Sequence, residues 1–412
     1  MDAILERCCG IDVHKESLTA CLLSGSLSGK PKVTIKTFST MTNALLKLKD
    51  WLEQEGCTHI AIESTGVYWK PVFNILEDSL TVVLANARDI KNVPGHKTDV
   101  KDCQWIAQLL RCGLIKASFI PPKPIRELRD LTRYRKKLIG ELSSEKNRVQ
   151  KILEDANIKL SSVATDIFGV SGTAMIEALL NGNTDAEAMA DLAKASLRKK
   201  LKELEQSLIG RVSKHHRFMI RQSLDHIGYL TEAIAALDAQ IDACMEPYRA
   251  ERELLEQIPG VKKKAAECII AEIGVDMSCF PTHAHLASWA GMSPGNNESA
   301  GKRRSGRTTH GNQWLRSTLM ESAWAASRTK GTYFKSRYHR LAARRGKKRA
   351  SVAVGHTILV AAYYILRDGC QYRELGGDYF ERLNPEGMRN MLVKRLEKMG
   401  NKVTLEPLPQ AA

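Results

Sequence analysis

Four carboxylates stand where the sequence favours a shared site. Asp12 follows a first apolar run, and Glu63 ends a later one. Carboxylates at the ends of neighbouring parallel strands converge in the crevice where ligands bind. Asp99 and Asp102 are three residues apart at the start of a helical run, so they share one helix face. We therefore expect these four side chains to meet in one acidic cluster suited to phosphoryl transfer.

The chemistry of such a cluster depends on cations. Carboxylates held together without a cation repel one another, which raises their pKa values. Two hard cations about 4 Å apart would instead bracket a scissile phosphate. We expect two Mg²⁺ ions, for which Mn²⁺ is a substitute, bound by Asp12, Glu63, Asp99 and Asp102. The alternative is structural, with Asp99 as a helix N-cap and Asp12 and Glu63 as hydrogen-bonded turn residues.

A segment further along the chain has many basic residues and almost no acidic ones. Between Ala300 and Arg349 only Glu321 is acidic. The Lys and Arg residues there alternate with aromatic residues, a mixture suited to phosphate contacts and to stacking on bases or sugars. We predict a nucleic-acid-binding surface, and its candidate contact residues are Lys302, Arg303, Arg304, Arg307 and Arg316.

A glycine turn upstream of this segment resembles a helix-hairpin-helix motif. Gly260 precedes Lys262, Lys263 and Lys264. Backbone N–H groups at such a turn, together with the following helix N-terminus, can hold a phosphate. Lys262 stands where a second glycine is common, so a plain helix turn is the alternative.

The expected elements place the acidic residues on a sheet. Three strand-like runs are followed by alternating helices and strands, which is the order of an RNase H-like α/β domain. The expected strands are residues 8–13, 18–23, 33–37, 59–62 and 81–84, and the expected helices are residues 41–54 and 71–77.

The rest of the chain divides at composition changes. The proline cluster at 121–124 predicts the end of the first domain. Amphipathic periodicity over residues 125–156 and 217–245 predicts a helical coiled-coil arm around a less regular insert. We predict a domain at 1–122, the arm at 123–250, a mainly α-helical domain at 251–375, and one further helix with a disordered tail at 376–412.

Composition restricts the class of protein. The 412 residues carry a formal net charge of +16 and a pI near 9.4, which suggests a polyanionic partner, either nucleic acid or an anionic membrane. The N-terminus fits no signal or transit peptide, and no apolar run reaches the roughly 20 residues that span a bilayer. We expect a cytoplasmic protein without a membrane role. The ten cysteines lack metal-binding spacing and are expected to be buried, reduced thiols.

The acidic motifs resemble those of a known family. Gly10-Ile11-Asp12 with Lys15, Glu63-Ser64-Thr65-Gly66, and Lys97-Thr98-Asp99 with Asp102 are similar to the DEDD tetrad of the insertion-sequence one-hundred-and-ten family of transposases. This resemblance implies a RuvC-like catalytic domain. It covers most of the chain apart from residues 160–215 and the tail.

The resemblance also implies a nucleophile. The segment from Leu286 to Lys302 is similar to the family's transposase signature, in which Ser299 matches the nucleophilic serine. Lys302 and the arginines after it would stabilise the reacting phosphate. Ser293 and Ser305 compete for this role, and a serine that only contacts phosphate is a further alternative.

The family further implies a reaction and partners. These are a covalent phosphoserine intermediate, donor and target DNA recognised through a bridge RNA encoded by the element, and a dimer or tetramer. One rival hypothesis is a metal-dependent, Holliday-junction-type nuclease that never uses Ser299. Another is a non-enzymatic nucleic-acid-binding protein whose carboxylates are structural.

Overall fold

The computed structural model describes residues 2–64, 66–86, 99–295 and 297–406. For residues 99–101, 297–299 and 303–305 the description covers the backbone and not the side chains. The chain divides into two compact units, Met1–Ile120 and Pro121–Ala412. The predicted division into four segments stays a prediction.

The first unit is built on a mixed sheet. Its strands lie in the order β3-β2-β1-β4-β5. The strand β1 pairs antiparallel with β2 and parallel with β4, and β5 continues in parallel beyond β4. The bounds are β1 Arg7–Val13, β2 Ser17–Ser24, β3 Lys32–Ser39, β4 His59–Glu63 and β5 Thr81–Ala85. This order and the strand directions fit the RNase H-like sheet predicted for the N-terminal region.

Helices cover both faces of this sheet, so its central strands read as nearly continuous apolar runs. The helices are α1 (Thr42–Gln54), α2 (Trp69–Leu76) and α4 (Asp99–Arg111). Cys9 and Ile11 of β1 pack into the core formed with α1 and α2, whereas Cys8 packs with α4 on the opposite face. Successive residues of β1 therefore point to opposite cores, as the two-residue period of a strand requires.

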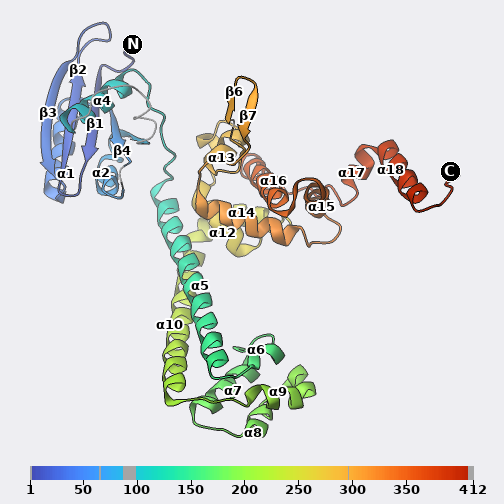
Figure 1. The fold of residues 1–412 in the computed structure, drawn as a ribbon. Helices are drawn as coiled ribbons and strands as arrows, with labels where there is room; N and C mark the ends of the chain where they lie inside the picture. Colours follow the sequence, from blue (N-terminus) through green and yellow to red (C-terminus); the bar gives the residue numbers. More distant parts are fainter. Residues whose placement is uncertain (1, 65, 87–98, 296, 407–412) are drawn as a thin grey trace. The chain divides into compact units, whose positions relative to one another are not determined.

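The second unit begins with two long helices that run side by side, α5 (Lys123–Asp155) and α10 (Lys214–Met245) (Figure 1). Ion pairs fix their antiparallel register, because Arg135 pairs with Asp238 and Asp155 pairs with His216. Apolar side chains fill the seam between them. Both helices match the predicted periodic segments, and the coiled-coil character of the pair stays a prediction.

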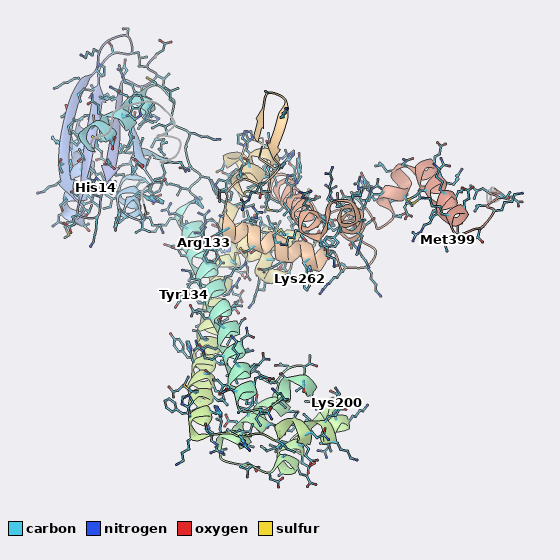
Figure 2. All side chains as sticks on the ribbon, in the orientation of Figure 1. His14, Arg133, Tyr134, Lys200, Lys262 and Met399 are labelled. Atoms are coloured by element: carbon cyan, nitrogen blue, oxygen red, sulfur yellow. The ribbon has the colours of Figure 1, made fainter. Side chains whose placement is uncertain are left out.

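A small helical lobe lies between the two long helices in sequence and has its own hydrophobic core. It comprises α6 (Leu160–Val163), α7 (Val170–Leu180), α8 (Ala186–Ala190), a 3₁₀ turn that ends at Lys200, and α9 (Leu201–Leu208). Figure 2 labels Lys200 in this lobe. The sequence pattern predicted this insert only as less regular than the two helices around it.

The C-terminal part of the second unit is mainly helical. It contains α11 (Arg249–Glu256), α12 (Lys263–Ile273), α13 (His283–Trp289), α14 (Gln313–Ala326), α15 (Tyr333–Arg345) and α16 (Lys347–Asp368). A two-stranded hairpin, β6 (Asn297–Ser299) and β7 (Lys302–Ser305), interrupts the helices and was not predicted. Within the described residues, α16 alone is long and apolar enough to cross a bilayer, and half of its most apolar stretch is buried in the protein.

The tail differs from the single helix predicted for it. Two helices, α17 (Tyr379–Leu383) and α18 (Pro385–Lys398), follow α16. Asn384 separates them and caps α18, because its side chain accepts a hydrogen bond from the N–H of Gly387. Met399, labelled in Figure 2, follows the last turn of α18. The predicted disordered end includes residues 407–412, which lie outside the described residues.

Candidate active site and nucleic-acid interface

Two of the predicted carboxylates lie at adjacent strand ends. Ile11 of β1 pairs with Ile62 of β4 in the parallel ladder, so Asp12 and Glu63 each come one residue later. Neighbouring strands in a sheet are about 4.8 Å apart. Both side chains belong to the sheet face that α4 covers, because Ala61, two residues before Glu63, packs in the core formed with α4.

Gly10 sets the approach of α4 to this face. A Cβ atom on Gly10 would lie 2.3 Å from the carbonyl oxygen of Cys103 and 2.4 Å from the amide nitrogen of Ala107. The absence of a side chain therefore lets the backbone of α4 rest directly on β1. Only glycine fits at this position.

The direction of α4 brings its N-terminus to the carboxylate end of the strands. Cys8 donates a weak hydrogen bond to the carbonyl of Ala107, and Gly10 lies against Cys103 and Ala107. The helix therefore runs antiparallel to β1, and its first turn, which contains Asp99 and Asp102, comes to the end of β1 where Asp12 stands. Asp102 is half-buried. The side chain of Asp99 lies outside the described residues, as do Lys97 and Thr98 of the predicted motif.

The buried position of Asp12 fits a cation site. Asp12 is 8% exposed, and His14 lies beside it with Nε2 3.3 Å from Oδ2. A buried carboxylate is costly unless a cation or hydrogen bonds compensate it, and carboxylate oxygens are the ligands that Mg²⁺ prefers. Among the described side chains, which exclude that of Asp99, no group of three His, Cys, Asp or Glu residues is close enough to hold a metal.

Burial makes several cysteines of the first unit unreactive. Burial raises the pKa of Cys8 to about 12 and that of Cys57 to about 11, so both thiols stay protonated at neutral pH. Burial also holds the pKa of Cys9 well above its usual range. The expectation that the cysteines are buried is wrong at two positions, because Cys279 and Cys370 are exposed.

Ser299 lies at the end of a tight hairpin. It ends β6 and pairs with Lys302, which begins β7. The two residues between them have left-handed backbone angles, with φ of 50° at Ala300 and 74° at Gly301. Positive φ at both central positions is typical of a type I′ turn, which matches the twist of the two strands. The backbone thus places Ser299 at the hairpin tip, directly before the turn.

The base of the hairpin is held by close backbone contacts. Pro294 pairs with Thr308, and the N–H of Gly295 donates to the carbonyl of Arg307 at 2.9 Å. A Cβ atom on Gly311 would lie 2.2 Å from the amide nitrogen of Gly291, so only glycine fits there. These contacts bring the segments before β6 and after β7 together.

A buried carboxylate anchors the helix that follows. Glu272 of α12 is fully buried and accepts hydrogen bonds from Arg133 at 2.7 and 2.8 Å and from the Asn312 side chain at 2.5 Å. Asn312 also caps α14, because its Oδ1 accepts from the N–H groups of Trp314 and Leu315. Figure 2 labels Arg133 on α5. Sequence reasoning missed Glu272, although a glutamate inside an apolar helical run is a signal for a buried ion pair.

The predicted helix-hairpin-helix is a turn between α11 and α12, and its phosphate-binding role stays a prediction. Gly260 has a φ of +86°, and a Cβ atom there would lie 2.3 Å from the carbonyl oxygen of Ser322 in α14. Lys263 pairs with Asp242 at 2.6 Å, and Lys264 pairs with Asp238 at 3.0 Å. The turn glycine is thus required for packing against α14. The two lysines tie α12 to α10.

The other predicted contact residues differ in their surroundings. Lys302 and Arg307 are exposed. Arg316 is half-buried, and its Nη1 donates to the carbonyl of Gly291 at 3.0 Å and to the Thr308 hydroxyl. Lys262, labelled in Figure 2, precedes α12 and is exposed. The side chains of Arg303 and Arg304 lie outside the described residues.

Family comparisons match both parts of the site. The model of DEDD-type IS110 transposases, described as "Transposase", matches residues 9–158, which include the four carboxylates. A second model, described as "Transposase IS116/IS110/IS902 family", matches residues 252–339, which include Ser299. Together the two matches span more than half of the chain.

Individual relatives match over shorter segments. An uncharacterized 43.6 kDa protein of insertion element IS110 from Streptomyces coelicolor is 33% identical over 147 residues, which cover 33% of this chain and 34% of that protein. A pilin gene-inverting protein from Moraxella bovis is 30% identical over 149 residues, covering 35% of this chain and 46% of that protein. The matched segment thus spans less than half the length of these relatives.

A solved structure of RuvC from Thermus thermophilus aligns with 27% of this chain and 99% of its own length, at 12% identity and a TM-score of 0.21.

Proposed function

Because the chain belongs to the IS110 family of transposases, we propose that it is a DNA recombinase that cleaves and rejoins strands to move an insertion sequence. The observation that carries this proposal is the convergence of Asp12, Glu63 and the first turn of α4 at one end of one sheet face. The names of the Moraxella relatives add support, since inverting a gene requires cutting and rejoining DNA.

The carboxylates form the proposed metal centre. Asp12, Glu63, Asp99 and Asp102 would hold two Mg²⁺ ions, which when bound supply charge stabilisation at the departing oxygen and a lower pKa for an attacking hydroxyl. The protein's own contribution is to position the four carboxylates. The strand ends fix Asp12 and Glu63, and the contact between Gly10 and α4 fixes the helix turn that carries the two other carboxylates.

Ser299 is the proposed nucleophile. Its Oγ forms a bond to phosphorus while the bond between phosphorus and a deoxyribose oxygen breaks, which leaves a phosphoserine link to one DNA end. The hydroxyl proton leaves Ser299, and the departing oxygen takes up a proton. Attack by a second strand's hydroxyl on the phosphoserine then reverses these bond changes and joins DNA. The backbone position of Ser299, directly before the turn of the hairpin, supports this role.

Basic residues near the hairpin are proposed to hold the nucleic acid. Lys302 pairs with Ser299 across the turn and is exposed, so its ammonium group is available to a phosphate next to the nucleophile. We also propose that a bridge RNA pairs with donor and target DNA, while the protein contacts backbones. The net charge of +16 supports a large polyanionic partner.

Oligomer assembly is part of the proposal. The exposed faces of α5 and α10 carry large apolar side chains, among them Tyr134, Phe218 and Tyr229. Figure 2 labels Tyr134 on α5. We propose that these helices associate into dimers or tetramers. Gel filtration with nucleic acid present that yields only monomer would contradict this.

Strand cleavage by metal-site variants tests the function. The full chain is incubated with Mg²⁺, end-labelled donor DNA and RNA transcribed from the element. Asp12→Asn and Asp102→Asn should each abolish cleavage. Asp78→Asn, an exposed aspartate of the same unit, is the matched control and should leave it unchanged. Cleavage that survives both site variants would overturn the assigned metal centre.

A hydrolytic nuclease is the second candidate, because the carboxylates belong to one compact unit and Ser299 to the other. In that mechanism a water molecule attacks the phosphate, and no protein becomes attached to DNA. Products would be free nicked strands, and Ser299→Ala would cleave as fast as the wild type.

A further inference from the structure

A basic cavity of about 970 Å³ opens in the second unit beside the hairpin. Segments far apart in sequence form its wall, namely the residues that flank β6 and β7, the helix α14, and the facing ends of α15 and α16. Its cationic lining residues are Arg307, Arg316, Arg337, Arg345, Lys348 and Arg349.

The charged side chains that line this cavity are all cationic. Among the described residues that line it there is no carboxylate, whereas Arg135, Lys263 and Lys264 of the same unit each pair with one. Arg345, Lys348 and Arg349 are exposed on a single bend between two helices. Like charges gathered this closely repel one another, and a bound polyanion removes that repulsion.

One guanidinium in the cavity is incompletely paired. Arg337 donates from Nη1 to the Tyr333 hydroxyl at 2.8 Å, while its buried Nε finds no hydrogen-bond acceptor among the described residues. An unsatisfied buried donor is unfavourable. An anionic ligand that shifts this side chain slightly would supply the missing acceptor.

The cavity lining also includes apolar residues, namely Met292, Pro294, Val352 and Ala353. A lining of cations and apolar side chains suits a nucleotide strand, because phosphates contact the cations while the sugar packs on the apolar side chains. The wall at Pro294 and Thr308 is at the same time the base of the Ser299 hairpin.

The hairpin fixes how far the cavity can be from Ser299. Thr308 lines the cavity, and Lys302, the partner of Ser299, is six residues earlier. Extended residues rise at most about 3.4 Å each, so the two places are no more than about 20 Å apart. That span corresponds to about six nucleotides of duplex DNA at 3.4 Å per nucleotide.

We propose that this cavity binds backbone phosphates of the DNA strand that Ser299 cleaves, a few nucleotides from the scissile phosphate. The inference rests on the proposed function, since the identity of the strand follows from the proposed nucleophile. It adds a strand-positioning site, with the exposed Lys348 and Arg349 among its contacts.

Binding of the full chain to oligonucleotides tests this site without requiring cleavage. A fluorescein-labelled 30-base-pair DNA duplex, its single strand, and an RNA strand of the same sequence are titrated at several KCl concentrations without Mg²⁺. The variant is Lys348→Ala with Arg349→Ala. The matched control is Lys394→Ala with Arg395→Ala, an exposed pair of the same residue types on α18.

The cavity variant should lose DNA affinity by roughly tenfold to a hundredfold at fixed salt. The slope of log K against log salt for the duplex should become shallower by about 1.8, since each lost phosphate contact contributes about 0.9. The control should bind duplex DNA within about twofold of the wild type, and circular dichroism should show equal folding of all three proteins.

Three results would overturn the inference. These are equal DNA affinity of cavity variant and wild type, an equal loss in the α18 control, and a loss confined to the RNA strand. The result of this binding test can be distinguished from a failure of the proposed cleavage reaction. If the cavity variant loses DNA affinity while the wild type never cleaves, phosphate binding by the cavity stands, whereas the recombinase proposal and the identity of the strand fail.

Discussion

Arg316 donates a hydrogen bond from Nη1 to the hydroxyl oxygen of Thr308 at 2.8 Å, across the base of the hairpin that carries Ser299. The same nitrogen donates to the carbonyl of Gly291 at 3.0 Å. One guanidinium thus joins the segments before and after the hairpin. Arg316 is therefore a positioning residue for the proposed nucleophile.

Arg316→Lys should slow cleavage while DNA affinity changes by less than about twofold. The lysine keeps the positive charge but presents a single ammonium in place of the planar guanidinium. Misplacement by about 1 Å can cost up to a hundredfold in rate, so we expect a loss of roughly tenfold or more. Single-turnover cleavage at saturating DNA measures this loss of rate. Arg328→Lys, at an exposed arginine, is the control.

Thr308→Val removes the acceptor and should slow cleavage to a similar degree. Because loss of the Arg316 guanidinium already removes the contact with Thr308, the double variant should be no slower than Arg316→Lys alone. Wild-type rates in both single variants would show that the hairpin keeps its position without this contact.

Gly10→Ala should destabilise the first unit and reduce cleavage. The added Cβ would lie 2.3 Å from a backbone oxygen of α4, so the helix that carries Asp102 has to move away from β1. Overpacking of this kind costs about 1–3 kcal/mol or more. Urea unfolding and the cleavage assay measure the two effects.

Gly140→Ala is the matched control, because Gly140 is an exposed glycine within α5 with no atom within 4 Å of an added Cβ. That change should raise the unfolding free energy by about 0.5–1 kcal/mol, since alanine favours helix more than glycine. If Gly10→Ala were as stable and active as the wild type, the proposed position of α4 would be wrong.

Glu272→Ala should be the most destabilising single change in the second unit. It leaves the Arg133 guanidinium and the Asn312 amide without their shared buried acceptor. Removing one partner of a buried ion pair costs about 3–5 kcal/mol. Glu321→Ala breaks an exposed pair with Lys136 and should cost about 0.2–1 kcal/mol. Urea midpoints of the two variants make the comparison, and equal midpoints would contradict it.

The pKa of His356 should report whether a polyanion occupies the basic cavity. Burial lowers its pKa below the usual 6.5, and the charges of Arg337 on α15 and His283 on α13 lower it further. In the free chain, folding stability therefore falls as pH drops from 6.5 towards the folded pKa, because the unfolded state takes up the proton first. Arg307 and Arg316 also line the cavity.

A bound polyanion should shift the pKa of His356 in the opposite direction. Phosphates near the ring favour the charged imidazole, so DNA binding should raise the pKa of His356 and become tighter as pH falls through that range. NMR titration of histidine-labelled protein, with and without the DNA duplex, measures the shift. His356→Gln identifies the signal and should remove this part of the pH dependence. An unchanged pKa on saturation with DNA would place the strand elsewhere.

Sequence patterns predicted the sheet better than the sites that surround it. Apolar runs predicted all five described strands of the first unit, and the runs of β1 and β4 are nearly continuous because these strands are buried on both faces. The position of Asp12 near the first turn of α4 could be expected from the strand order of an RNase H-like sheet. The contact at Gly10 that enforces it depends on a helix that begins at Asp99, almost 90 residues later.

The second unit shows where pattern reading fails. The hairpin of Ser299 has strands of three and four residues, too short for a periodic signal, and its turn uses Ala300 at a positive φ where glycine or asparagine is usual. His356 escaped notice because it lies in an apolar helix with no neighbouring motif. Only the fold brings it next to Arg337.

The most direct test of the account is a search for a covalent link between this protein and DNA. The full chain is incubated with Mg²⁺, end-labelled donor DNA and RNA from the element, and the products are run on a denaturing gel with and without protease. Ser299→Ala, Ser293→Ala, Ser305→Ala and Asp102→Asn are compared with the wild type. We predict a protease-sensitive protein–DNA adduct that is lost in Ser299→Ala and Asp102→Asn and kept in the two other serine variants. Free nicked DNA that forms equally in Ser299→Ala would contradict serine-based recombination and identify the chain as a hydrolytic nuclease.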